Sequence, residues 1–142
     1  MKKSVVLSIQ GRQTYMDQEP EIIDFITEGF LEKIGDAWVI SYEESALTGM
    51  EGVTTKFTVF PGKIILQRTG KLKSEMIFQE GILHDSLYQL EFGALLITVC
   101  ATQIDAQLND EGGTVDLVYG IEIEQSEGGV IEYHLQVSPQ KS

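Results

Sequence analysis

The last third of the chain alternates between apolar and polar residues almost without interruption. Apolar residues occupy every second place from Val115 to Ile123 and again from Ile131 to Val137, and mostly polar or small residues stand between them. A β-strand points successive side chains to opposite faces, so this period of two predicts strands with one buried and one solvated face. The sequence contains no long amphipathic helix pattern and no internal repeat.

The same alternation, interrupted by turn residues, runs through the rest of the chain. In the run 21–34 apolar residues occupy both parities, and an apparent switch near Gly29 predicts a bulge or bend. The stretch 82–92 fits either one helical turn or an edge strand, and we expect a strand. The other strands are predicted over residues 3–15, 37–45, 53–60, 63–69, 72–79, 94–108 with a change of phase after Ala101, 115–124 and 131–137.

Eight to ten antiparallel strands with short connections fit a sandwich or an up-and-down barrel. A barrel is favoured because consecutive hairpins need no crossovers and closure removes exposed strand edges. A chain of 142 residues has the length of one domain. We therefore expect one all-β domain over 1–142, an antiparallel up-and-down β-barrel of eight to ten strands.

The charge of the chain is acidic and unevenly spread. The net charge is −12, and residues 74–142 hold 12 acidic residues against Lys141 alone. This balance argues against nucleic acid as a partner and is typical of a solvated surface, although the acidic half could also dock a protein. The apolar run near the N-terminus is too short for a signal peptide or a membrane span, and the single Cys100 forms no internal disulfide. A soluble cytoplasmic protein is the default expectation.

The chain resembles the YwiB-like family of small bacterial proteins along nearly its whole length. The resemblance implies a calycin-type, lipocalin-like β-barrel and assigns no function. The residues that carry it are Thr27, Glu28, Gly29 and Phe30, then Ser41, Tyr42, Glu43 and Glu44, then Arg68, Thr69 and Gly70, then Phe92, Gly93, Leu95 and Ile97, and finally Gly113 with Tyr119.

The turn at 61–62 decides where Arg68 points. If Phe60 pairs with Lys63 across this turn, Thr55 faces Arg68, and Arg68 shares a face with the apolar residues of both strands. An arginine that points into an apolar interior needs a partner, because leaving it unpaired is costly.

The strand 37–45 supplies a candidate partner for this arginine. Trp38, Ile40, Tyr42 and Glu44 share one parity, and their bulk predicts that it faces inward. We therefore expect an interior polar cluster of Arg68, Glu44 and Tyr42. The cluster could simply hold strands in register or lie at the rim. It could also bind an anionic head group, because guanidinium binds carboxylate or phosphate bidentately, and interior arginine and tyrosine have that role in lipocalin-like barrels.

Other chemistry is not indicated by the sequence. The two histidines, His84 and His134, lack the neighbouring ligands of a zinc site. If residues 126–128 form a three-residue hairpin loop, His134 lies opposite Gly120, and we expect it to shield that glycine. There is no Gly-x-Ser-x-Gly nucleophile elbow and no glycine-rich phosphate loop. The sequence therefore predicts no metal and no cofactor, and an enzyme is the least favoured class.

The function we expect is the binding of a small apolar or amphipathic anionic ligand in the barrel interior. The alternative is a non-catalytic protein-interaction or structural module whose core is filled. An internal cavity of roughly 300 Å³ or more favours the first and a filled core the second. The residues expected to line the ligand site are Arg68, Glu44, Tyr42, Trp38, Phe57, Tyr119 and Tyr133.

Overall fold

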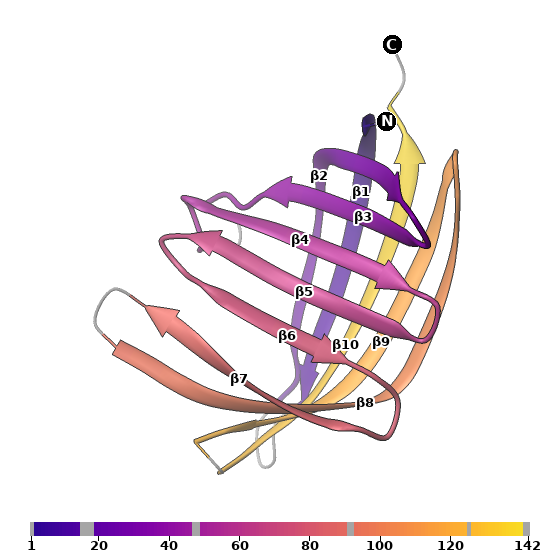
Figure 1. Cartoon of the computed structure of the whole chain (residues 1–142). Helices are drawn as coiled ribbons and strands as arrows, with labels where there is room; N and C mark the ends of the chain where they lie inside the picture. The colour runs from indigo at the N-terminus through magenta and orange to yellow at the C-terminus, as the bar shows by residue number, and fades with distance from the viewer. Residues whose placement is uncertain (1, 15–18, 47–48, 91–92, 125, 141–142) are drawn as a thin grey trace.

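The computed structural model describes residues 2–14, 19–46, 49–90, 93–124 and 126–140, and these form ten β-strands (Figure 1). No helix in this part of the chain is long and apolar enough to cross a membrane. In chain order the strands are β1 (Lys2–Thr14), β2 (Glu21–Ile34), β3 (Ala37–Glu43), β4 (Val53–Phe60), β5 (Lys63–Gly70), β6 (Ser74–Phe78), β7 (Leu83–Leu90), β8 (Gly93–Asn109), β9 (Gly112–Ile123) and β10 (Ser126–Pro139).

The ten strands form one sheet that curls into a nearly closed barrel. Its order is β6-β5-β4-β3-β2-β1-β10-β9-β8-β7, so each strand lies beside its neighbours in sequence and β1 joins β10 to complete the circuit. Strands β3 to β6 cross one side of the barrel at a steep angle to β1, β9 and β10 behind them (Figure 1). The predicted all-β class, the up-and-down topology and the strand number are confirmed.

Most local expectations agree with the observed pairing. Phe60 pairs with Lys63 and Thr55 with Arg68, as the turn at 61–62 predicts. The ambiguous stretch is a strand from Leu83 to Leu90, and residues 91–92 lie outside the described part. The change of phase after Ala101 is a register shift between Ala101 and Gln103 in β8.

The expected position of His134 is wrong. His134 lies opposite Asp116, and Gly120 lies opposite Val130. The expected position requires a hairpin loop over residues 126–128, but β10 already begins at Ser126, which pairs with Ile123, so the pairing is displaced. A register shift between Glu127 and Gly129 then moves the pairing back by one residue.

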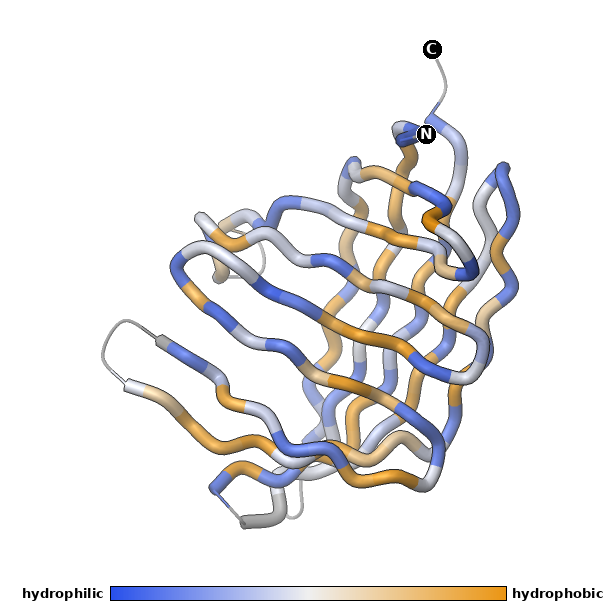
Figure 2. Tube along the Cα trace, viewed as in Figure 1, coloured by the Kyte–Doolittle hydropathy of each residue, from blue (hydrophilic) through white to orange (hydrophobic). Residues whose placement is uncertain are grey.

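Buried apolar side chains from both sides of the barrel form one core cluster. Figure 2 shows hydrophobic positions along the strands of both sides. On the β3–β6 side, one row runs across the strands through Ile40, Phe57, Leu66 and Met76, each at most 3% exposed. Cross-strand neighbours on one face have Cβ atoms about 5 Å apart, so such a row is a continuous apolar band. Across the barrel, β1, β9 and β10 contribute residues that are at most 2% exposed: Val5, Leu7, Ile9, Val115, Leu117 and Leu135.

Strand β2 departs from its expected parity. Its register with β1 runs through Gly29 without interruption, so there is no bulge and the predicted switch of parity is wrong. Gly29 is instead required by close packing, because a Cβ there would lie 2.5 Å from the Ser41 carbonyl oxygen. Figure 1 shows the expected bend, where β2 curves toward β3. The even-numbered apolar residues of β2 are therefore on the outer face of the barrel.

The junction between β6 and β7 is the incomplete part of the barrel wall. Lys73 and Gln89 exchange two backbone hydrogen bonds of 3.0 and 2.8 Å at one end, and Ile82 N donates to Gln79 O at the other. Between these points the described residues of β6 and β7 form no ladder of hydrogen bonds. We call this opening the β6–β7 seam.

Candidate functional site

A row of polar side chains crosses the inner face of the barrel next to the apolar row described above. The strand registers place Tyr42 beside Thr55, Thr55 beside Arg68, and Arg68 beside Ser74. All four are buried, with exposed fractions of 5%, 0%, 8% and 8%. The row ends at β6, so its last member lies at the seam.

The carboxylate of Glu44 accepts hydrogen bonds at one end of this row. Glu44 follows directly after β3, and its backbone N–H donates to Val53 O at 2.9 Å, which holds the side chain beside β4. Thr55 Oγ1 donates to Glu44 Oε2 at 2.5 Å, and the Tyr42 hydroxyl also donates to this carboxylate. Burial and the neighbouring Glu44 charge raise the pKa of Tyr42 far above its usual value, so the phenol stays protonated.

Arg68 occupies the middle of the row as a buried cation. Burial alone would lower its pKa, but the phenol groups around it, chiefly those of Tyr133, Tyr88 and Tyr42, raise the pKa above its usual value. Arg68, Glu44 and Tyr42 are all buried, as expected. Among the described residues no ion pair joins Arg68 to Glu44, and a shared binding role for the three residues stays a prediction.

Three buried polar atoms in the described residues lack a hydrogen-bond partner, and all three belong to one place. They are Arg68 Nε, Ser74 Oγ and Ser86 Oγ. All three residues line a single cavity of about 620 Å³ that opens to solvent at the seam. Each unsatisfied buried polar group costs about 1–3 kcal/mol, so their convergence calls for an explanation.

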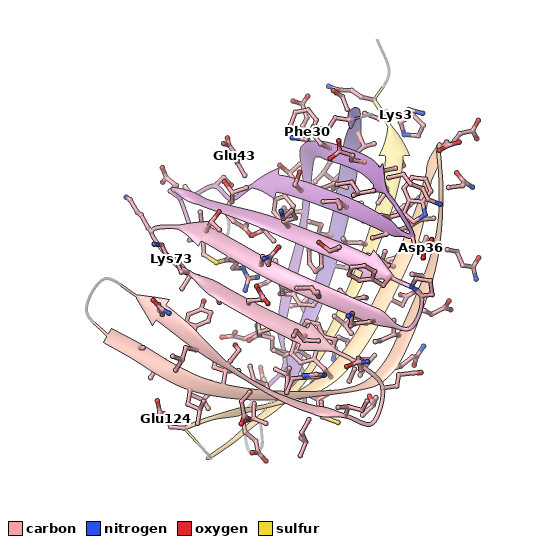
Figure 3. All side chains as sticks on the ribbon, in the orientation of Figure 1. Lys3, Phe30, Asp36, Glu43, Lys73 and Glu124 are labelled. Carbon is pink, nitrogen blue, oxygen red and sulfur yellow. The ribbon has the colours of Figure 1, made fainter. Side chains whose placement is uncertain are left out.

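The rim of this cavity combines charged, polar and apolar groups. Lys73 adds a second positive charge, and Figure 3 shows it where the chain enters β6. Glu75 and Asp85 oppose this charge, but each carboxylate already accepts a hydrogen bond, from Gln67 at 3.0 Å and from Thr98 at 2.6 Å. The apolar part of the rim comes from Ile77, Leu87 and Leu96.

The remaining residues of the expected ligand site, Trp38, Phe57, Tyr119 and Tyr133, do not line the cavity at the seam. Phe57 packs edge-on against Tyr133, with ring centroids 6.3 Å apart, and Tyr119 contacts Phe78 at 4.4 Å. These contacts occupy the interior behind Arg68. Trp38 lies two rows away from Arg68 and packs its ring beneath Lys33 Nζ at 4.9 Å.

The histidines take part in local surface pairs. His134 Nδ1 lies 2.6 Å from Asp116 Oδ1, directly across from it on β9, and His84 Nε2 lies 2.8 Å from Gln79 Oε1. Within the described residues, no three His, Cys, Asp or Glu side chains are arranged to hold a metal ion.

Sequence reasoning missed the residues on the far side of Arg68, namely Ser74, Ser86 and Tyr88. Ser74 could have been found by carrying the Arg68 register onto the next strand, but the irregular turn at 70–73 hides the pairing. Ser86 and Tyr88 lie on β7, the one strand whose period the sequence does not reveal.

Comparison with known proteins places this barrel in a family. The structure is similar to the crystal structure of the ywiB protein from Bacillus subtilis, with a TM-score of 0.88 and 21% sequence identity over 99% of this chain and 94% of that one. The uncharacterized beta-barrel protein YwiB of Bacillus subtilis (strain 168) is 25% identical over 124 residues, which is 87% of this chain and 86% of the relative. The model of the family described as a domain of unknown function, DUF1934, matches residues 7–137. The chain therefore belongs to the DUF1934 family.

Proposed function

We propose that this protein binds a small amphipathic anion, with the anionic head at Arg68 and the body of the ligand in the cavity at the β6–β7 seam. The observation that carries the proposal is the convergence of Arg68 Nε, Ser74 Oγ and Ser86 Oγ on that cavity without partners. All three groups can donate hydrogen bonds, and a carboxylate or phosphate is an acceptor for several donors at once.

The chemistry of the row separates its two charges. Glu44 is held by Thr55 and Tyr42, so its negative charge is stabilised at the far end of the row from Ser74. Arg68 keeps its charge and has no carboxylate paired with it in the described residues. Binding an anion stabilises a buried guanidinium in this state more than it stabilises an exposed guanidinium, because the buried group has already lost its hydration.

The filled interior limits the size of the ligand. The contacts among Phe57, Tyr119 and Tyr133 leave the seam as the hollow that reaches Arg68, so the ligand enters head first and keeps its body among Ile77, Leu87 and Leu96. This differs from the lipocalin-like arrangement, in which the ligand lies inside the barrel. Kinship with the calycins and a cytoplasmic location stay predictions of the sequence.

Calorimetric titration with two defined probes, inorganic phosphate and hexanoate, tests the proposal. Hexanoate adds an apolar tail for the rim, so we expect it to bind at least fivefold more tightly than phosphate if the rim contacts the ligand. Arg68→Met keeps the bulk of the side chain and removes its charge, and we expect it to weaken hexanoate binding at least tenfold. Native mass spectrometry of freshly purified protein would show whether a natural anion copurifies.

Lys56→Met is the matched control, because it removes one positive charge from an exposed position on the neighbouring strand β4. It should leave both affinities within twofold. Equal binding by wild type and Arg68→Met, or no binding of either probe at millimolar concentration, would refute an anion site at Arg68. An unchanged unfolding free energy in Arg68→Met would show that a loss of binding is not a loss of fold.

A further inference from the structure

Strand β2 presents an unusual row of apolar side chains to solvent. Ile22, Ile26, Phe30 and Ile34 all lie on its outer face, with exposed fractions of 73%, 69%, 44% and 56%. Acidic residues stand between them on the same face, at positions 24, 28 and 32. Single exposed apolar residues are common on protein surfaces, but four on one face of one strand are more than scattered exposure gives, and such groups mark interaction surfaces. Figure 3 shows Phe30 projecting outward at the bend of β2.

The backbone of the same strand is open along most of its length. β2 pairs with β1 from Glu21 to Glu32, but it pairs with β3 only from Phe30 to Ile34. Between Glu21 and Gly29 the second edge of β2 has no strand partner within the described residues. We call this segment the free edge of β2. Every second residue of a free edge offers its N–H and C=O to an added strand.

Of the usual devices that protect an edge strand, this segment has only charged side chains, and all of these are acidic. Edges are commonly blocked by lysine, proline or a bulge. The free edge contains no lysine or proline, and its register with β1 is uninterrupted. A groove of about 990 Å³ continues from it over the bend, lined among others by Ile26, Phe30 and Ser41. The unpaired backbone, the exposed apolar side chains and the groove therefore lie at the same part of the surface.

The charge of the free edge identifies its partner. Glu21, Asp24 and Glu28 are exposed along it, Glu43 lies at the end of the groove, and the sequence contains no lysine or arginine from Met16 to Glu32. Positive charge nearby is confined to the ends of β1, where Arg12 faces Ile22 and Lys2 faces Glu32. A second copy of the free edge would bring more carboxylates and no lysine or arginine to this edge, so self-pairing is disfavoured.

We propose that the free edge of β2 binds an extended segment of a partner protein in which basic and apolar residues alternate on one face. An added antiparallel strand would place its outward side chains beside Ile22, Asp24, Ile26 and Glu28, so every second outward residue should be lysine or arginine. Its inward residues would cover Ile23 and Phe25, so that face of the partner is apolar. The free edge does not include Arg68, and this proposal does not depend on the anion site.

The test uses a fluorescent peptide of twelve residues whose outward positions alternate lysine with isoleucine and whose inward positions are valine or threonine. Anisotropy titration against the full chain measures its affinity, and amide hydrogen exchange locates the contact. We expect at least tenfold slower exchange at alternate residues of the free edge in the saturated complex. A peptide with glutamate in place of lysine should bind at least tenfold more weakly.

Two variants at exposed residues distinguish specific binding at the free edge from nonspecific binding of the peptide elsewhere on the surface. Ile26→Lys places a like charge in the path of the peptide and should weaken binding at least tenfold. Leu83→Lys makes the same change at a residue that is 70% exposed on β7, and it should change the affinity less than twofold. Neither site is buried, so both variants should fold.

Three results would overturn the proposal. They are no binding of the basic peptide, binding that Ile26→Lys leaves unchanged, and binding without exchange protection in the free edge. Sedimentation velocity of the chain alone tests whether a second copy of the chain binds at the free edge. A dimer that dissociates in Ile26→Lys would assign the edge to a second copy instead of a basic segment.

Discussion

The barrel is completed at two junctions, β1 with β10 and β6 with β7, and they differ in how well they are closed. Along β1 and β10 ten residue pairs form a continuous antiparallel ladder, and its inward residues include Val5, Leu7 and Leu135, each at most 1% exposed. Along β6 and β7 only the ends are joined, and the inward residues of β6 beside the gap are Ser74, Met76 and Phe78, while Ser86 on β7 lines the same cavity as Ser74.

The two junctions differ in the polar groups that they bury. Apolar inward residues gain free energy when the strands come together and exclude water. At the seam, Met76 and Phe78 share the inner face of β6 with Ser74, and Arg68 Nε and two serine hydroxyl groups are buried there without partners, which costs free energy for each of them. The seam is open where the row of buried polar side chains meets it, so the weakest part of the barrel and its most chemically distinctive part coincide.

The largest expected effect tests the closed junction. Leu7→Ala removes a fully buried side chain from β1 and should lower the free energy of unfolding by about 2–5 kcal/mol in urea denaturation. Leu87→Ala is the matched change at the seam, where the side chain is 52% exposed, and should cost less than about 1 kcal/mol. Similar losses for the two variants would mean that the two junctions contribute equally to the free energy of unfolding.

A change of intermediate size tests the far end of the polar row through pH. The pKa of Tyr42 is raised in the folded state, so folded and unfolded chains both hold its proton below about pH 10, the usual value for tyrosine. As the pH rises above that value, the unfolded chain loses the proton first, and stability falls by up to about 1.4 kcal/mol per pH unit. The Tyr42→Phe variant has no phenol proton to lose, so its stability lacks this dependence on pH.

Unfolding free energies of wild type and Tyr42→Phe between pH 8 and 11.5 measure the effect. At pH 8 the variant should be less stable by about 1 kcal/mol, because it loses the hydrogen bond to Glu44. The gap should shrink above pH 10. Parallel pH profiles would contradict a buried, protonated Tyr42.

The smallest expected effect tests the seam itself. Ser74→Ala removes a buried hydroxyl that has no hydrogen-bond partner, so the free energy of unfolding should stay equal or rise by less than about 1 kcal/mol. The same variant should weaken hexanoate binding measurably, since it removes a donor from the proposed site. A clear loss of stability would mean that Ser74 has a structural role instead.

Sequence reasoning succeeded where the chain pattern and the turn chemistry agreed. The pairing of Thr55 with Arg68 followed from a two-residue turn and a count of parity. The prediction for His134 failed because the chain already turns before residue 126, where Ser126 pairs with Ile123, and not over residues 126–128. At Gly29, apolar residues on both parities suggested a switch, whereas the structure keeps one parity and exposes the other.

The sequence by itself determined the strands, their antiparallel order and the inward direction of Arg68, because hydrophobic period and turn geometry are local properties. Only the tertiary structure decided that Ser74 and Ser86 share a cavity with Arg68, that Glu44 bonds to Thr55, and that β2 has an open, apolar outer edge. These features depend on the residue at which each pair of strands stops pairing. Packing between residues that are distant in the sequence determines that point.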